Sequence, residues 1–396
     1  MQSLEGVNIL DMTHMPPGQF CSMMLSDMGA EVVRVDQPPR KAASGDGGGV
    51  TARFEEMMGS GYGAFNRNKR SIMLNLRDEE GRRVLYRLVE TMDVLVEGFR
   101  PGVAERLGVD FKTLSGLNPR LIYCSMSGYG QDGPYRDMPG HDINYVAIGG
   151  ALLTFGDPPP PIPNFIADYA GATLHAVIGI LLALLAREKT GKGQHVDVSY
   201  TDGVVSLMTQ FTGEYLASGD LAAAKAQSNM IVSNAGYGAY KASDGKYVSV
   251  GCVEPWFWEN LCRALGREEF IPDHANWDKQ DEIKKRFAET FSTRTRDEWF
   301  ELFKTMNIAV GKVYDLDEIF TDPQVLHRQM LVEIPGRQGG MEKHVGIPVK
   351  LSDTPGKIRS AAPLPGGNTG ELLQELGYSD SEIKALAEKG TIHLPQ

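Results

Sequence analysis

Three short segments place ionisable side chains beside glycine or proline at the ends of apolar runs. They are Pro139–Tyr145 with His141 and Asp142, Asn164–Gly171 with Asp168, and Gly251–Trp258 with Glu254. Histidine and carboxylate side chains can both exchange protons near neutral pH when their surroundings tune them. A carboxylate can also attack an acyl group as a nucleophile. The residue types therefore point to proton transfer or to acyl transfer.

Each of these residues also has a structural alternative. His141 can make a backbone hydrogen bond at a helix start, and Asp142 is of the type that caps helix N-termini. Asp168 can cap the helix that enters residues 172–186, and Glu254 can open the helix that follows it. Local sequence leaves both interpretations open.

The charge of the chain is unevenly distributed. Lys and Arg number 40 against 51 Asp and Glu, a net charge of −11, which argues against a general nucleic-acid binder. Residues 1–120 hold 15 basic and 16 acidic side chains, so the acid excess lies after residue 120. The near-neutral first part can still hold a small anionic ligand. Hydrophobic residues make up 42%, as in an ordinary globular protein.

Cysteine usage and apolar runs predict a cytoplasmic protein that is not inserted in a membrane. The four cysteines are scattered without a CxxC pair, which disfavours a disulfide framework or a thiolate metal site. The first residues lack the features of a signal peptide. The longest apolar stretch, Ala172–Ala186, is shorter than the roughly 20 residues of a membrane span and predicts a buried helix.

Strand-like and helix-like segments alternate through the first two hundred residues. The expected strands are Val7–Met12, Glu31–Val35, Ser71–Leu76, Val94–Glu97, Leu121–Met126 and Gln194–Ser199. The expected helices between them include Gly18–Gly29, Asp78–Thr91 and Leu174–Arg187. This order predicts an α/β fold with a large, Rossmann-like parallel sheet. Gly45–Gly49 does not match the dinucleotide-binding pattern and is predicted to be a loop.

A second, smaller α/β domain is expected over residues 226–328. It begins with a hairpin of Tyr237–Lys241 and Tyr247–Gly251, joined through Asp244 and Gly245, and continues with helical patterns. Residues 1–225 form the first segment of the large domain, and residues 329–396 are predicted to return to it.

Several longer motifs carry a family resemblance. They are Leu4–Val7, Asp27–Asp36, Asn66–Ile72, Gly98–Gly102, Asn118–Tyr123, Ser127–Gln131 and Thr190–Gln194. In this order they resemble the family of class III CoA-transferases and α-methylacyl-CoA racemases. The resemblance implies an interlocked homodimer, with the active site between the large domain of one subunit and the small domain of the other. It implies an acyl-CoA substrate, and no metal or redox cofactor beyond coenzyme A as part of that substrate.

Within the family, the motifs favour the racemase. Gly140–Tyr145 resembles the racemase segment whose histidine is an acid/base, and Ala167–Gly171 resembles the segment of its second, aspartate acid/base. The resemblance thus implies that His141 and Asp168 exchange the α-proton of a 2-methyl-branched acyl-CoA, with Glu254 orienting His141. The backbone N–H groups of residues 140 and 142 would then face the thioester oxygen.

Two alternatives remain open. In the transferases an aspartate at the position of Asp142 attacks acyl-CoA and forms a mixed anhydride, then an enzyme–CoA thioester. The chain can also be an inactive CoA-binding subunit of a heteromeric transferase, although all the ionisable positions are filled. Isolated glycines at 236 and 238 replace the glycine-rich stretch usual in transferases.

Coenzyme A carries a 3′-phosphate and a pyrophosphate, so its site needs cations. By resemblance these are Arg34, Arg70, Arg77 and Arg106. Gln37 departs from the family, because racemases commonly have another arginine there.

Overall fold

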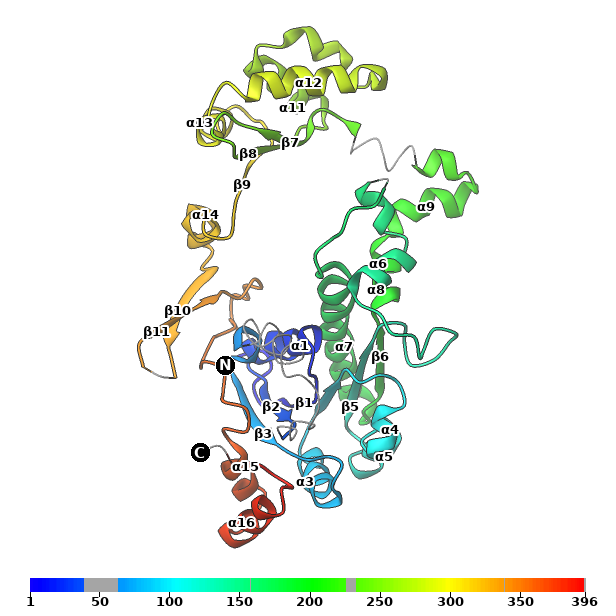
Figure 1. Ribbon diagram of the computed structural model, residues 1–396, viewed down its shortest axis with the longest axis vertical. Coiled ribbons are helices and arrows are strands. Elements are labelled where there is room, and N and C mark those ends of the chain that lie inside the picture. Colours follow the sequence, from blue (N-terminus) through cyan, green and yellow to red (C-terminus); the bar gives the residue numbers. More distant parts are fainter. Residues whose placement is uncertain (39–62, 157, 226–232, 338, 395–396) are drawn as a thin grey trace, which may run out of the picture. The chain divides into compact units, whose positions relative to one another are not determined.

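The computed structural model describes the chain except for residues 39–62, 157, 226–232, 338 and 395–396 (Figure 1). The Gly45–Gly49 loop prediction lies outside the described residues. The chain divides into two compact units, Met1–Met208 with Gln329–Gln396, and Thr209–Arg328. The first boundary thus falls before helix α9, Thr209–Ser218, rather than after residue 225, and α9 buries none of its side chains.

The large unit contains a six-stranded sheet in the order β3-β2-β1-β4-β5-β6, with all neighbouring pairs parallel. Its strands are β1 (Asn8–Asp11), β2 (Glu31–Asp36), β3 (Lys69–Met73), β4 (Val94–Glu97), β5 (Ile122–Ser127) and β6 (His195–Ser199). The central strands β4 and β5 are buried along their whole length, as parallel strands covered by helices on both faces are. This confirms the predicted fold class. The strand order reverses between β1 and β4, and such a switch point opens a crevice at the carboxyl ends of the strands.

Two layers of helices cover the sheet. Alternate strand residues enter opposite cores: Leu10 packs with helices on one face, and Ile9 packs with helices on the other. The first face holds α3 (Glu79–Val89), α5 (Phe111–Leu117), α15 (Thr369–Glu375) and α16 (Asp380–Glu388). The second holds α1 (Pro16–Asp27) and α7 (Leu174–Thr190). Residues after 328 therefore contribute two helices to the core of the large unit.

Shorter elements connect these layers. They are α4 (Val103–Leu107), α6 (Asp142–Ile148), the π-helix η3 (Ile166–Thr173), α8 (Tyr200–Leu207), the hairpin strands β10 (Leu331–Pro335) and β11 (Met341–Val345), and the 3₁₀ turns η1 (Gly63–Asn66) and η2 (Leu152–Phe155). The periodicity of the sequence did not predict α4, and it gave no bounds for α6 or η3, although a helix start near His141 and near Asp168 was one of the alternatives. Each is short or irregular, so it lacks the repeated apolar spacing that reveals a helix.

The small unit is built on an antiparallel sheet in the order β7-β8-β9. Its elements are β7 (Tyr237–Lys241), β8 (Tyr247–Gly251), α11 (Pro255–Leu265), η4 (Glu268–Asp273), η5 (Trp277–Lys279), α12 (Gln280–Phe291), α13 (Arg296–Phe303), β9 (Val310–Val313), η6 (Ile319–Thr321) and α14 (Pro323–His327). The predicted hairpin is confirmed, and Gly245 at its turn has a φ of 82°. Its own aromatic-rich core includes Trp258, Phe287 and Phe291.

Helix α7 corrects the prediction of a buried helix over residues 172–186. Its buried apolar side chains, Ala176, Ile180 and Ala183, are small or medium-sized and pack against the sheet, and Arg187 near its end is also buried. Ile178, Leu181, Leu182 and Leu185 are 52, 41, 60 and 61% exposed. By length and composition the continuous helical stretch Ile166–Thr190 could cross a membrane, and 33% of its most apolar window is buried in the fold. The helix is therefore buried on one face only.

Candidate active site

His141 and Asp142 lie at the start of α6. His141 is the N-cap residue, and its backbone N–H donates to Asn144 Oδ1 at 3.0 Å. Its side chain is exposed, whereas Asp142, the first helical residue, is only 3% exposed. Gly140 is required just before them, because a Cβ there would lie 2.6 Å from the Tyr145 ring. Because the Tyr145 ring packs tightly against this turn, it fixes the position of the His141 backbone.

Asp142 caps a different helix from its own. Its Oδ2 accepts hydrogen bonds from the backbone N–H groups of Ala167 at 2.8 Å and Asp168 at 2.9 Å, at the first turn of η3. Its Oδ1 is buried and has no hydrogen-bond partner among the described residues. Burial raises the pKa of the carboxyl, and the backbone N–H groups partly oppose this. The alternative that Asp142 is the N-cap of α6 is therefore wrong, since His141 occupies that position.

Asp168 lies in the first turn of the π-helix η3, whose N-cap is Phe165. Burial, together with the negative charge of Asp142, raises the pKa of Asp168 to about 7, while a hydrogen bond from Asn164 opposes the rise. Both protonation states of Asp168 are therefore populated near neutral pH, as a group that gives and takes protons requires. π-helical turns occur often at functional sites. Asp168 is not the helix cap that its sequence position also allowed.

The structure brings His141 and Asp168 to neighbouring backbone positions. His141 directly precedes Asp142, and the Asp142 carboxylate holds the N–H of Asp168. Glu254 is in the small unit, where it is the N-cap residue of α11. Its carboxylate makes no capping hydrogen bond and is half-buried. The predicted role of Glu254 toward His141 stays a prediction.

A cavity of about 800 Å³ lies near the carboxyl ends of β1 and β4, where His14 and Phe99 follow the strands. Arg77 and Arg106 line it, and neither has an ion-pair partner among the described residues. The remaining lining residues are His14, Gln37, Pro38, Leu74, Asn75, Leu76, Phe99, Val103, Leu107, Ala387, Gly390, Ile392 and His393. None of them is acidic, although the chain carries a net charge of −11. The size and the charge suit a phosphate-bearing ligand.

The other two predicted cations are held by carboxylates. Arg34 Nε contacts Asp36 Oδ1 at 2.7 Å. One guanidinium nitrogen of Arg70 lies 2.6 Å from Glu375 and 3.4 Å from Glu371, both on α15. Neither Arg34 nor Arg70 lines the cavity. The structure thus brings two of the four predicted arginines together.

Sequence reasoning missed Glu97, which ends β4 and is 3% exposed. Its Oε2 accepts the backbone N–H of Phe99 at 2.7 Å, and its carboxyl is hydrogen-bonded to the Ser125 side chain. Burial raises its pKa to about 7. Glu97 therefore holds the turn that brings Phe99 to the cavity. An acidic residue at the end of an apolar strand was the available signal.

The large unit thus has the doubly wound parallel sheet of an open α/β protein, with a cavity that contains two arginines near the switch point, where ligands of such sheets bind. The chain belongs to CoA-transferase family III, whose sequence profile matches residues 4–369. It is similar over 95% of its length to the solved structure of a CAIB/BAIF family protein from Brucella suis, with a TM-score of 0.79, 28% identity and 99% of that chain covered.

The similar curated proteins include both activities of the family. The human α-methylacyl-CoA racemase is 34% identical over 97% of this chain and 96% of its own length. The succinyl-CoA–L-malate CoA-transferase β subunit of Chloroflexus aurantiacus is 33% identical, over 98% of each chain. The formyl-CoA:oxalate CoA-transferase of Streptomyces avermitilis is also 33% identical, over 99% of this chain and 100% of its own. The protein is an enzyme of this racemase and transferase superfamily.

Proposed function

We propose that the protein epimerises 2-methyl-branched acyl-CoA thioesters by moving the α-proton between His141 and Asp168. The proposal rests on the hydrogen bonds and burial of the Asp142 carboxylate. Its Oδ2 is occupied by two backbone N–H groups of the helix that carries Asp168, and its Oδ1 is buried. This arrangement suits a positioning residue better than a nucleophile. Asp168, with a pKa of about 7, has the properties of a proton carrier.

The chemistry uses one acid/base on each face of the α-carbon. The neutral imidazole of His141 takes the α-proton from one epimer and leaves an enolate. The protonated carboxyl of Asp168 then gives its proton to the opposite face, so the product is the other epimer, with His141 protonated and Asp168 ionised. The reverse reaction starts from that state. The backbone N–H of Asp142 at the start of α6 is the donor we propose for the enolate oxygen.

The alternative is a CoA-transferase with Asp142 as nucleophile. Its supporting observation is that Asp142 Oδ1 has no hydrogen-bond partner among the described residues. In that mechanism Oδ1 would attack the thioester carbonyl and CoA thiolate would leave. The thiolate would then attack the resulting anhydride, release the first acid and leave an enzyme–CoA thioester. Burial of Oδ1 opposes the first attack, because acyl-CoA must reach that oxygen.

Dependence on an acceptor acid separates the two activities. One pure epimer of a 2-methylacyl-CoA is incubated with the enzyme, with and without a second carboxylic acid. We expect the opposite epimer to form at the same rate in both reactions. Product formed only when the acceptor acid is present, together with an enzyme adduct trapped by hydroxylamine, would establish the transferase instead.

We propose that Arg77 and Arg106 bind the phosphate groups of coenzyme A. Arg106→Ala is expected to weaken CoA binding by about tenfold, since a charge-assisted contact to phosphate is lost. Isothermal titration with CoA measures this. The matched control is Arg83→Ala on α3, because Arg83 is exposed and contacts Glu79 outside the cavity. Equal CoA affinity of the two variants would refute the assignment.

We also propose a homodimer in which Glu254 of the partner subunit orients His141. The exposed leucines of α7 are the surface we assign to the second copy, because the opposite side of α7 packs on the sheet and anchors it there. We expect light scattering to give twice the chain mass of 43.4 kDa. Leu182→Glu combined with Leu185→Glu is expected to give an inactive monomer. An active monomer, or wild-type protein that floats with lipid vesicles, would contradict the proposal.

A further inference from the structure

The segment Gly390–Leu394 follows α16 and returns across the end of β3. The backbone N–H of Asn75 donates to the Thr391 carbonyl at 2.9 Å, and Ile392 forms an isolated bridge with Leu74. Thr391 is fully buried and its hydroxyl is hydrogen-bonded to Asp78, while Ile392 is 2% exposed. The 390–394 segment is therefore fixed to the sheet by both backbone contacts and buried side chains.

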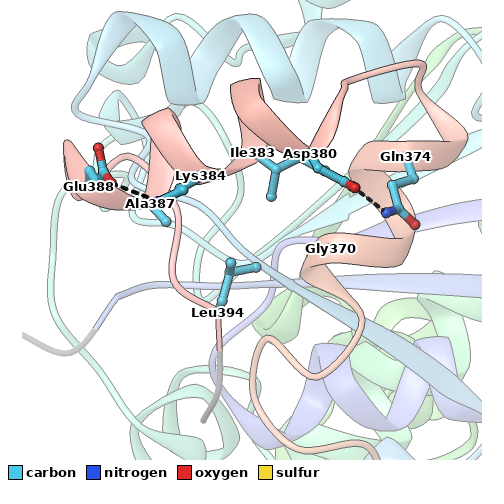
Figure 2. A pocket seen from close by; sticks show the side chains of 8 residues that line it. All are labelled: Gly370, Gln374, Asp380, Ile383, Lys384, Ala387, Glu388 and Leu394. Atoms are coloured by element: carbon cyan, nitrogen blue, oxygen red, sulfur yellow. Dashed lines mark hydrogen bonds and ion pairs between the residues drawn. The ribbon is translucent and has the colours of Figure 1, made fainter.

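This segment separates two hollows in the surface of the large unit. Gly390, Ile392 and His393 line the cavity that contains Arg77 and Arg106. Leu394 lines a second hollow of about 540 Å³ between α15 and α16, together with Ile383 and Lys384, as Figure 2 shows. Ala387 borders both hollows. His393 and Leu394 are adjacent in the sequence but line different hollows.

We propose that His393 is a third phosphate-binding side chain of the CoA site, beside Arg77 and Arg106. An imidazole N–H donates a hydrogen bond to a phosphate oxygen in the neutral as well as the charged form. Among the described residues, the cavity lining offers no carboxylate that would compete for it. Because the preceding Ile392 is buried and bridged to β3, little backbone freedom is lost when His393 binds a ligand.

His393 also gives the site a donor from a segment more than 280 residues away from Arg106 in the sequence. Gln37, which lines the same cavity, is uncharged. The inference rests on the proposed CoA site and deepens it. It is independent of whether the enzyme is a racemase or a transferase, since both bind the same nucleotide portion.

The test measures CoA binding by isothermal titration for wild type, His393→Ala and His393→Arg. We expect His393→Ala to bind CoA about fivefold more weakly and His393→Arg to bind within twofold of wild type. In turnover assays the KM for acyl-CoA should rise in His393→Ala while kcat stays unchanged. Lys384→Ala is the matched control, because Lys384 lies on α16 but lines the other hollow. It should bind CoA as wild type does.

The outcomes separate the two levels of the proposal. If wild type does not bind CoA, the proposed function itself is wrong. If wild type binds CoA and His393→Ala binds it equally well, only the role of His393 is wrong. If His393→Arg binds as weakly as His393→Ala, the phosphate contact is refuted, because a guanidinium should replace it. Titration with 3′-dephospho-CoA identifies the phosphate that His393 contacts. If His393 binds the 3′-phosphate, wild type and His393→Ala should bind 3′-dephospho-CoA with equal affinity.

Discussion

Asp168→Asn is expected to slow epimerisation by about 10³- to 10⁴-fold, because asparagine keeps the shape of the side chain but cannot carry the proton. The reaction is followed by chiral separation of the two acyl-CoA epimers. In deuterium oxide the variant should still exchange the α-proton of the epimer that His141 deprotonates, without inverting it. His141→Ala is the mirror control and should exchange only the other epimer. Epimerisation by Asp168→Asn within threefold of wild type would exclude Asp168 as an acid/base.

The pH dependence of wild type follows from the raised pKa of Asp168, about 7. For the epimer that Asp168 deprotonates, Asp168 must be ionised and His141 protonated, and for the other epimer the reverse holds, so each direction needs one base and one acid. The ratio of kcat/KM for the two epimers equals their equilibrium constant, which does not change with pH, and both directions therefore share one profile. We expect kcat/KM to be bell-shaped for both epimers, with one limb near pH 7 from Asp168. A profile without a limb near pH 7 would contradict the assignment of Asp168 as an acid/base.

Asp142→Asn is expected to retain epimerisation within about tenfold of wild type, since the asparagine Oδ1 can still accept the N–H groups of Ala167 and Asp168. Loss of the neighbouring negative charge should lower the pKa of Asp168, which shifts the limb of the pH profile that belongs to Asp168 to lower pH. The measurement is the pH profile of epimerisation by this variant. If Asp142 were the nucleophile, the Asp142→Asn variant would instead lose all activity.

Asp142→Ala is the companion variant. It removes the acceptor and leaves two N–H groups at the start of η3 without their partner, which costs about 1–3 kcal/mol for each buried donor. A lower melting temperature and reduced epimerisation are expected together. The contrast between asparagine and alanine separates the positioning role of Asp142 from its charge. Equal activity of the two variants would contradict the capping role.

The sequence was sufficient to predict the parallel sheet. Buried β-branched runs separated by helical patterns predicted the six parallel strands, and ionisable residues beside glycine or proline, together with the family resemblance, singled out His141 and Asp168. The role of Asp142 could not be predicted, because its hydrogen-bond partners lie 25 and 26 residues further along the chain. Local sequence suggested that it caps its own helix, and only the tertiary fold shows that it caps η3.

The cations show the same limit. The four arginines are equivalent in sequence, but Arg70 meets Glu375 after a separation of 305 residues, whereas Arg77 and Arg106 meet no carboxylate among the described residues. Arg70 is unavailable to a ligand because α15 packs against β3. The spacing of residues in the sequence does not predict this contact. His393 was missed for the same reason, since its neighbours in the cavity come from distant parts of the chain.

The α-deuterium content of both epimers tests the central claim most directly. Wild-type enzyme is incubated in deuterium oxide with one epimer of a 2-methylacyl-CoA and no acceptor acid, and both epimers are separated and analysed by mass spectrometry. The two-base mechanism predicts that the opposite epimer appears and carries deuterium at the α-carbon, with label also entering the recovered substrate as the reaction reverses. Unlabelled, uninverted substrate from folded enzyme that still transfers CoA to an added acid would contradict it.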